Sequence, residues 1–260
     1  RKAPAVSHTA EVCLRKVTRE HARDLMDALC GALLEGTMSL PECAAALELM
    51  RELLEAAPLT MVPILRTIAL TVVHCLSPGN QPLRERATPA GTAVLNELVQ
   101  RYPMIAFHQG TQTLVVGGAD GVIIVYDLKE GAITHELPTR SPEEDRPVAV
   151  AARNYDYLAE ADFLTPGVNL AEKVVRGITA CAFNDQGRII GVYSFEDAQI
   201  HFWQLYSPLS FLGIGRPHPI CSFGVSRTPW PKLAGIQLQW VSSRSVNLRR
   251  GLRDVLTYNL

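Results

Sequence analysis

The sequence predicts a mixed α and β protein whose helices and strands occupy separate segments: HEAT- or armadillo-like helical repeats, then about three blades of a WD-type β-propeller. Three observations lead to this prediction. Apolar residues recur at the helical period as far as Tyr102, and at the strand period of two from Pro103 onward. A group of short strands separated by tight turns also occurs twice. We therefore expect a helical segment over residues 1–102 and a partial propeller over residues 103–260.

The first two helices are indicated by apolar stripes with clear ends. One stripe runs from Ala22 to Leu33, and Gly36 is suited to end that helix. The next helix is expected to begin at Ser39–Glu42, with Pro41 in its first turn. Its apolar positions fall on one face at helical spacing: Cys43, Ala46, Leu47, Met50, Leu53, Leu54 and Ala57.

The stretch Met61–Leu76 is apolar on nearly every side, which allows two interpretations. A membrane span needs about 20 consecutive apolar residues, whereas this run is shorter and contains Arg66 and His74. We therefore interpret it as a helix buried between neighbours. A fourth helix is expected to begin at Thr88, with Pro89 at its first position, and to reach Tyr102.

Two antiparallel helix pairs joined by short loops resemble a stretch of helical solenoid. Units of that kind cannot bury their apolar faces alone, so further helices are expected before residue 1. The first residue is an arginine, and we expect the segment to belong to a longer chain. A short helical piece is also expected near Val12–Val17.

Two blade-like units follow the helices. Strands are expected over Met104–His108, Thr113–Gly117, Val122–Leu128 and Ala132–Leu137, and again over Ile178–Phe183, Arg188–Phe195, Gln199–Leu205 and Ile220–Val225. Aligning the two units places Asp120 with Asp197, and Tyr126-Asp127 with Trp203-Gln204. We assign structural roles to these blade positions. Each turn aspartate is expected to bind backbone amides, and each aromatic ring to pack between adjacent blades.

A third, degenerate blade is expected over Gly235–Ser242, Ser245–Arg250 and Asp254–Asn259, with Trp240 in its first strand. An insert over residues 138–175 separates the first two units. Its polar first part is typical of a flexible loop. Its later part, which is rich in aromatic residues, is expected to pack on its own domain, with binding to a partner as the alternative. Propellers typically close with about 4 to 8 blades. The missing blades must therefore come from elsewhere in a longer chain or from a partner.

No residue pattern points to catalysis, a cofactor or a metal ion. The seven histidines lack partners at metal-binding spacing, and the six cysteines form no Cys-x-x-Cys pair. Reduced, buried thiols are favoured over disulfides. The sequence Gly117–Gly121 enters a strand rather than a helix, so it is interpreted as a hairpin turn and not as a phosphate loop. We expect no catalytic, cofactor-binding or metal-binding residues, and hence no enzyme.

The charge pattern also limits the partners. A net charge of -1 does not indicate the basic surface that binding of nucleic acid requires. The densest basic patch, Arg249-Arg250 with Arg253, is interpreted as a solvated turn rather than as a contact with an anionic membrane. Protein partners remain as the expected class.

Taken in chain order, three stretches resemble one known family. Arg101–Lys129, Gly177–Leu205 and Lys232–Leu248 contain the phrases FHQ-x-TQ-x-L-x-VG, HFWQ and W-x-S-x-R-x-V. Together these resemble the C-terminal region of the rabconnectin beta-subunit family, which consists of large WD-repeat proteins. Two features depart from the family's pattern: the long insert, and Arg176-Gly177 where many WD repeats have Gly-His.

The resemblance implies a scaffold that regulates assembly of the vacuolar-type proton pump (V-ATPase). It implies the rabconnectin alpha subunit and pump subunits as partners, and a cytoplasmic location at the periphery of endomembranes or vesicles. Two alternatives stay open. One is a subunit of another solenoid-propeller scaffold, such as a vesicle-coat or ciliary-transport complex. The other is an enzyme whose active site lies elsewhere in a longer chain.

Overall fold

The computed structural model describes residues 21–118, 120–139, 178–194, 197–206, 216–225, 236–250 and 254–260. The chain divides into two compact units, Arg1–Leu98 and Val99–Leu260. In the described ranges, the chain forms helices first and then three antiparallel sheets. The helical piece expected near Val12–Val17 and nearly all of the insert lie outside these ranges. The domain division expected after Tyr102 stays a prediction.

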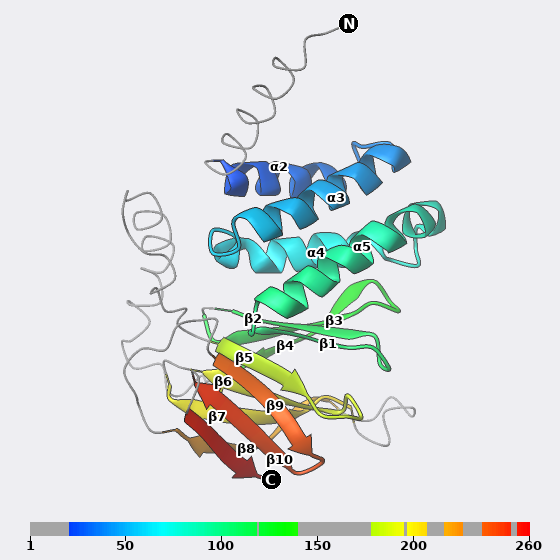
Figure 1. The fold of residues 1–260 in the computed structure, drawn as a ribbon. Coiled ribbons are helices and arrows are strands. Elements are labelled where there is room, and N and C mark those ends of the chain that lie inside the picture. The colour runs from blue at the N-terminus through cyan, green and yellow to red at the C-terminus, as the bar shows by residue number, and fades with distance from the viewer. Residues whose placement is uncertain are drawn as a thin grey trace, which may run out of the picture. The chain divides into compact units, whose positions relative to one another are not determined.

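The helices are α2 (Ala22–Leu34), α3 (Leu40–Ala56), α4 (Leu65–Cys75) and α5 (Gln81–Arg101), with one turn of 3-10 helix, η1 (Val62–Ile64), before α4 (Figure 1). Helix α2 packs against both α3 and α4. The expected stripe of α3 is buried from Cys43 to Leu54. Helix α4 is buried on several sides, as its composition predicts. No helix in the described ranges is long and apolar enough to cross a membrane.

Local signals explain the ends of α2 and α3. The Glu42 carboxylate accepts hydrogen bonds from the backbone N–H of Ser39 at 2.8 Å and from its hydroxyl at 2.6 Å, as part of a capping box. These bonds also lower the pKa of the Glu42 carboxyl. Beyond α2, Gly36 has a φ of 68°, a left-handed conformation that ends a helix at little steric cost to glycine.

The start expected for the fourth helix is wrong, because α5 begins already at Gln81. Asn80 caps it: its side-chain oxygen accepts the N–H of Leu83 at 3.2 Å, and its carbonyl accepts that of Arg84 at 2.9 Å. Pro82 lies in the first turn, where a missing N–H costs nothing, and Pro89 lies inside the helix. Pro78 and Pro82 lie close to Asn80, so the sequence around Asn80 indicated a loop rather than the start of a helix.

The three sheets are meanders in which strands that follow one another in the chain are neighbours. Sheet A has β1 (Ile105–His108), β2 (Thr113–Gly117), β3 (Val122–Asp127) and β4 (Ala132–Pro138); sheet B has β5 (Ile178–Phe183), β6 (Ile189–Ser194), β7 (Gln199–Gln204) and β8 (His218–Gly224); sheet C has β9 (Ile236–Ser242), β10 (Ser245–Arg250) and β11 (Asp254–Asn259). This is the strand order of a propeller blade. All the expected strands are present, although β8 begins at His218 rather than at Ile220.

Sheets A and B repeat one register. Leu114 pairs with Tyr126 in sheet A as Ile190 pairs with Trp203 in sheet B. A register shift lies just before Tyr126 between β3 and β4, and just before Trp203 between β7 and β8. The strand pairing therefore follows the alignment of the two units made from the sequence.

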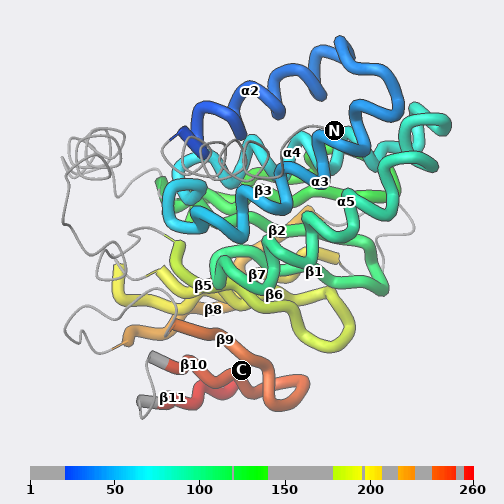
Figure 2. The backbone as a smooth tube through the Cα atoms, turned by 45° about the horizontal axis from the view of Figure 1, so that its top comes forward, coloured from blue at the N-terminus to red at the C-terminus, as the bar shows by residue number. Residues whose placement is uncertain are grey.

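The first strands of the three sheets lie side by side (Figures 1 and 2). Strand β5 lies next to β1 on one side and to β9 on the other. Sheets A, B and C thus follow one another in a stack, as adjacent blades do.

Thr139 and Ile178, which flank the undescribed part of the insert, bind the same turn. Thr139 donates its N–H and its hydroxyl to the carbonyl of Gly121, at 3.0 and 2.8 Å. Ile178 donates its N–H to the carbonyl of Gly118 at 3.1 Å. This turn joins β2 to β3, and Gly121 has a φ of 77°, which favours glycine.

Candidate functional site

Groups that could carry out chemistry do not gather in the described parts of the chain. Among these residues, no three His, Cys, Asp or Glu side chains are placed to hold a metal ion. The Gly-rich turn after β2 leads directly into β3, as a hairpin does. Of the residues singled out from the sequence, the three aspartates lie at turns, Tyr126 and Trp203 lie within β3 and β7, and Trp240 lies where two sheets meet.

In sheet A, both aspartates accept backbone amides. Asp120 Oδ1 accepts the N–H of Val122 at 3.0 Å, and Asp127 Oδ1 accepts those of Lys129 at 2.7 Å and Glu130 at 3.3 Å. Each bond stabilises a tight turn, because it gives an acceptor to a backbone N–H that is not bonded within the sheet. Tyr126 is almost fully buried. Its role in packing between blades stays a prediction.

Sheet B also has an aspartate followed by a residue of positive φ at the aligned position. Asp197 accepts a hydrogen bond from the hydroxyl of Ser194 at 2.8 Å, and the next residue, Ala198, has a φ of 52°. Trp203, which aligns with the buried Tyr126, is only half-buried. Trp240 of β9 donates its indole N–H to the carbonyl of Ala182 in β5 at 3.0 Å. Trp240 therefore joins sheet C to sheet B.

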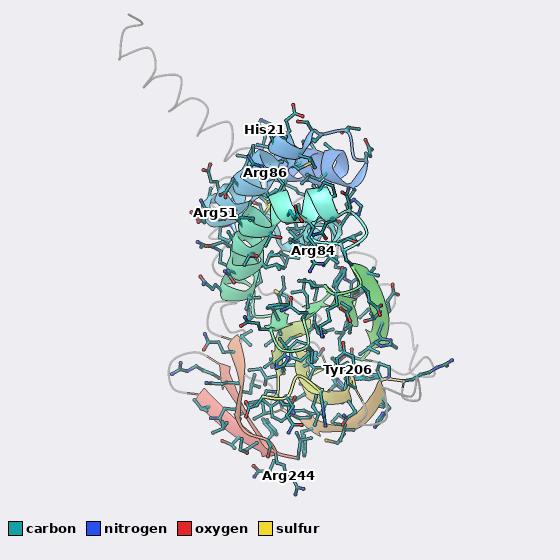
Figure 3. All side chains as sticks on the ribbon, turned by 90° about the vertical axis from the view of Figure 1, so that its right-hand side faces the viewer. His21, Arg51, Arg84, Arg86, Tyr206 and Arg244 are labelled. Atoms are coloured by element: carbon teal, nitrogen blue, oxygen red, sulfur yellow. The ribbon has the colours of Figure 1, made fainter. Side chains whose placement is uncertain are left out.

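Sheets A and B are joined by polar contacts and by one close approach. The N–H of Cys181 donates to the carbonyl of Pro103 at 2.8 Å. The Tyr206 hydroxyl, labelled in Figure 3, lies 2.9 Å from the hydroxyl of Thr113, and burial raises the pKa of this tyrosine. Gly117 makes room for Ile178, because a Cβ at Gly117 would lie 2.1 Å from its Cγ2 atom.

His108, at the end of β1, links the same two sheets through its ring. The N–H of Thr111 donates to Nδ1 at 3.1 Å, so Nε2 carries the proton and donates it to the carbonyl of Asp185 at 3.2 Å. The ring centroid lies 5.8 Å from that of Phe183. Gly187 has a φ of 66°, and a Cβ there would lie 2.1 Å from Nδ1. The junction therefore requires glycine at this position.

Sequence reasoning did not single out His108, Gly187 or Tyr206. A lone histidine in a strand carries no signal for a partner 77 positions away. The one available clue was that His108 belongs to the phrase FHQ-x-TQ-x-L-x-VG. That phrase, like the one containing Trp240, includes a residue that holds two sheets together.

Sheets B and C are joined by an apolar cluster. The Phe202 ring lies edge-on to Trp240 at 5.7 Å and to Phe223 at 6.0 Å, and Phe223 lies 5.7 Å from Tyr258. Buried residues from both sheets complete the cluster: Ala180, Tyr193, Ile200, Val225, Ile236, Leu238, Val246 and Leu248. This junction depends mainly on the burial of apolar surface.

The opposite face of sheet C is polar but nearly uncharged, and we take it as the candidate interaction surface. We call it the outer face, and it consists of Gln237, Gln239, Val241, Ser245, Asn247, Arg249, Val255, Thr257 and Asn259. Val241 is 61% exposed and Val255 47%. Arg249, from the basic patch noted in the sequence, is the one charged residue of this set. Depletion of charge is typical of the centres of protein interfaces.

The described cysteines are free thiols, as the sequence predicts: Cys30, Cys43, Cys75, Cys181 and Cys221. Burial raises the pKa of Cys75 to about 12 and also raises the pKa of Cys30 and Cys181. A raised pKa keeps a thiol neutral and unreactive at physiological pH. These side chains therefore act as small apolar groups in the core.

No family model and no curated protein matches the sequence. Among solved structures, one of Hsv2 from Kluyveromyces lactis overlaps 62% of this chain and 42% of Hsv2, at 13% identity and a TM-score of 0.39. Another, in which loop 6CD is replaced by a Gly-Ser linker, overlaps 60% and 38%, at 11% identity and a TM-score of 0.37. The chain thus spans less than half the length of Hsv2. At these TM-scores the blade assignment rests on strand order and register alone.

Proposed function

We propose that the chain is part of a non-enzymatic scaffold that binds protein partners. The observation that supports this most directly is the stack of three sheets, two of which repeat the same register and the same bulge. A stack of blades exposes flat faces and strand edges, and both can bind segments of other proteins. The nearly uncharged outer face of sheet C is one such surface.

The helical unit fits the same role. We propose that α2 to α5 belong to a solenoid of the HEAT or armadillo type, since α2 packs on both α3 and α4 and since α4 is buried on several sides. A solenoid followed by propeller blades is an architecture suited to holding several proteins at once.

The finer proposal is a regulator of V-ATPase assembly, located at the periphery of endomembranes. It rests on the ordered resemblance to the rabconnectin beta-subunit family. Each of the three phrases contains a residue that joins neighbouring sheets: His108, Phe202 and Trp240. The resemblance therefore includes residues that hold the sheets together, which supports a common fold. The role on the pump and the alpha-subunit partner come from the family alone.

Purification of native complexes tests this proposal. The full-length protein, tagged at its own locus, is purified under mild conditions and its partners are quantified by mass spectrometry against an untagged control. We expect pump subunits and a rabconnectin alpha subunit to be enriched at least about tenfold. Enrichment of vesicle-coat or ciliary-transport subunits instead, or of neither group, overturns the proposed role on the pump.

A further inference from the structure

We draw no further inference here: the strongest candidate, the row of hydrogen-bonded side chains that runs from Tyr206 through Thr113 and Thr111 to His108, belongs to the junction of sheets A and B that is already described.

Discussion

The specific contacts that can be named at the two junctions in the stack of sheets differ in kind. Sheets A and B meet through separate polar contacts, those of His108, Tyr206 and the Cys181 amide, and through the close approach at Gly117. Sheets B and C meet through a cluster of aromatic and aliphatic side chains around Phe202. Hydrogen bonds are directional and each contributes about 1 kcal/mol net. Apolar burial is non-directional and scales with area.

The difference predicts how each junction responds to substitution. Polar contacts depend on individual donors, acceptors and glycines, so single changes among them have separate effects that can be assigned by double-mutant cycles. An apolar junction shares its stabilisation among many side chains, so removal of a large central one leaves a cavity lined by all the others.

The largest effect is expected for Phe202→Ala at the centre of the B–C cluster. Truncation of a buried phenylalanine costs about 3 to 5 kcal/mol, because apolar contacts are lost and a cavity remains. Chemical denaturation measures the free energy of unfolding. Val241→Ala, on the exposed outer face of the same sheet, is the control and should cost less than about 0.5 kcal/mol. Equal costs for the two variants would contradict the assignment of the cluster.

Gly187→Ala should be the most damaging single-methyl change at the A–B junction. The new Cβ would meet the His108 ring at 2.1 Å, in a backbone conformation that alanine adopts only with strain. We expect a loss of about 2 to 3 kcal/mol. In the double variant with His108→Ala the clash disappears and only the backbone strain remains. Additive costs in this cycle would show that the two residues do not meet.

Because of Cys181, at the junction of sheets A and B, the free energy of unfolding should decrease with rising pH in the alkaline range. Burial raises the pKa of its thiol above the ordinary value of 9.0, so the folded chain favours the neutral form. Its contribution to stability is therefore complete below about pH 9 and is lost as the pH rises further, by at most about 1.4 kcal/mol per pH unit. Unfolding measured from pH 8 to 11 should show a smaller decline for Cys181→Ala than for the natural chain. Equal declines in the free energy of unfolding for the two proteins would contradict this contribution of the Cys181 thiol.

Tyr206→Phe tests a single polar contact between sheets A and B. Loss of its hydroxyl removes the bond to Thr113 and should cost about 1 kcal/mol. Thr113→Val alone should cost more, because it also removes the bond from the Thr113 hydroxyl to that of Thr111, and the double variant should cost less than the sum of both. Calorimetry of the four proteins gives the coupling energy. A coupling energy near zero would show that this contact does not stabilise the junction.

The smallest expected effect is a gain within sheet B. Ala198 has a φ of 52°, whereas Gly121 takes the aligned place in sheet A with a φ of 77°. Ala198→Gly relieves strain in the left-handed region, and we expect a gain of about 0.5 to 1 kcal/mol. Gly121→Ala should show the opposite sign. A loss of stability on Ala198→Gly would mean that the packing of its methyl group outweighs the strain.

The sequence predicted the order of elements well because period and turn chemistry are local signals. The switch from helical to alternating spacing at Pro103, and the alignment of Asp120 with Asp197, both appear in the strand pairing. The start of α5 was missed because a local cap at Asn80 competed with prolines on either side. The contacts between sheets were missed for another reason: residues such as His108 and Asp185 are far apart in sequence, and no pattern in one chain links them.

The shared turn that binds Thr139 and Ile178 has a consequence for protein engineering. Because Thr139 bonds to Gly121 and Ile178 bonds to Gly118, the two ends of the segment between them are held by one turn. The cost of closing such a loop grows only slowly with its length. A short Gly-Ser linker could therefore replace the segment between them, or a reporter domain could be inserted there, while the register of sheets A and B is kept.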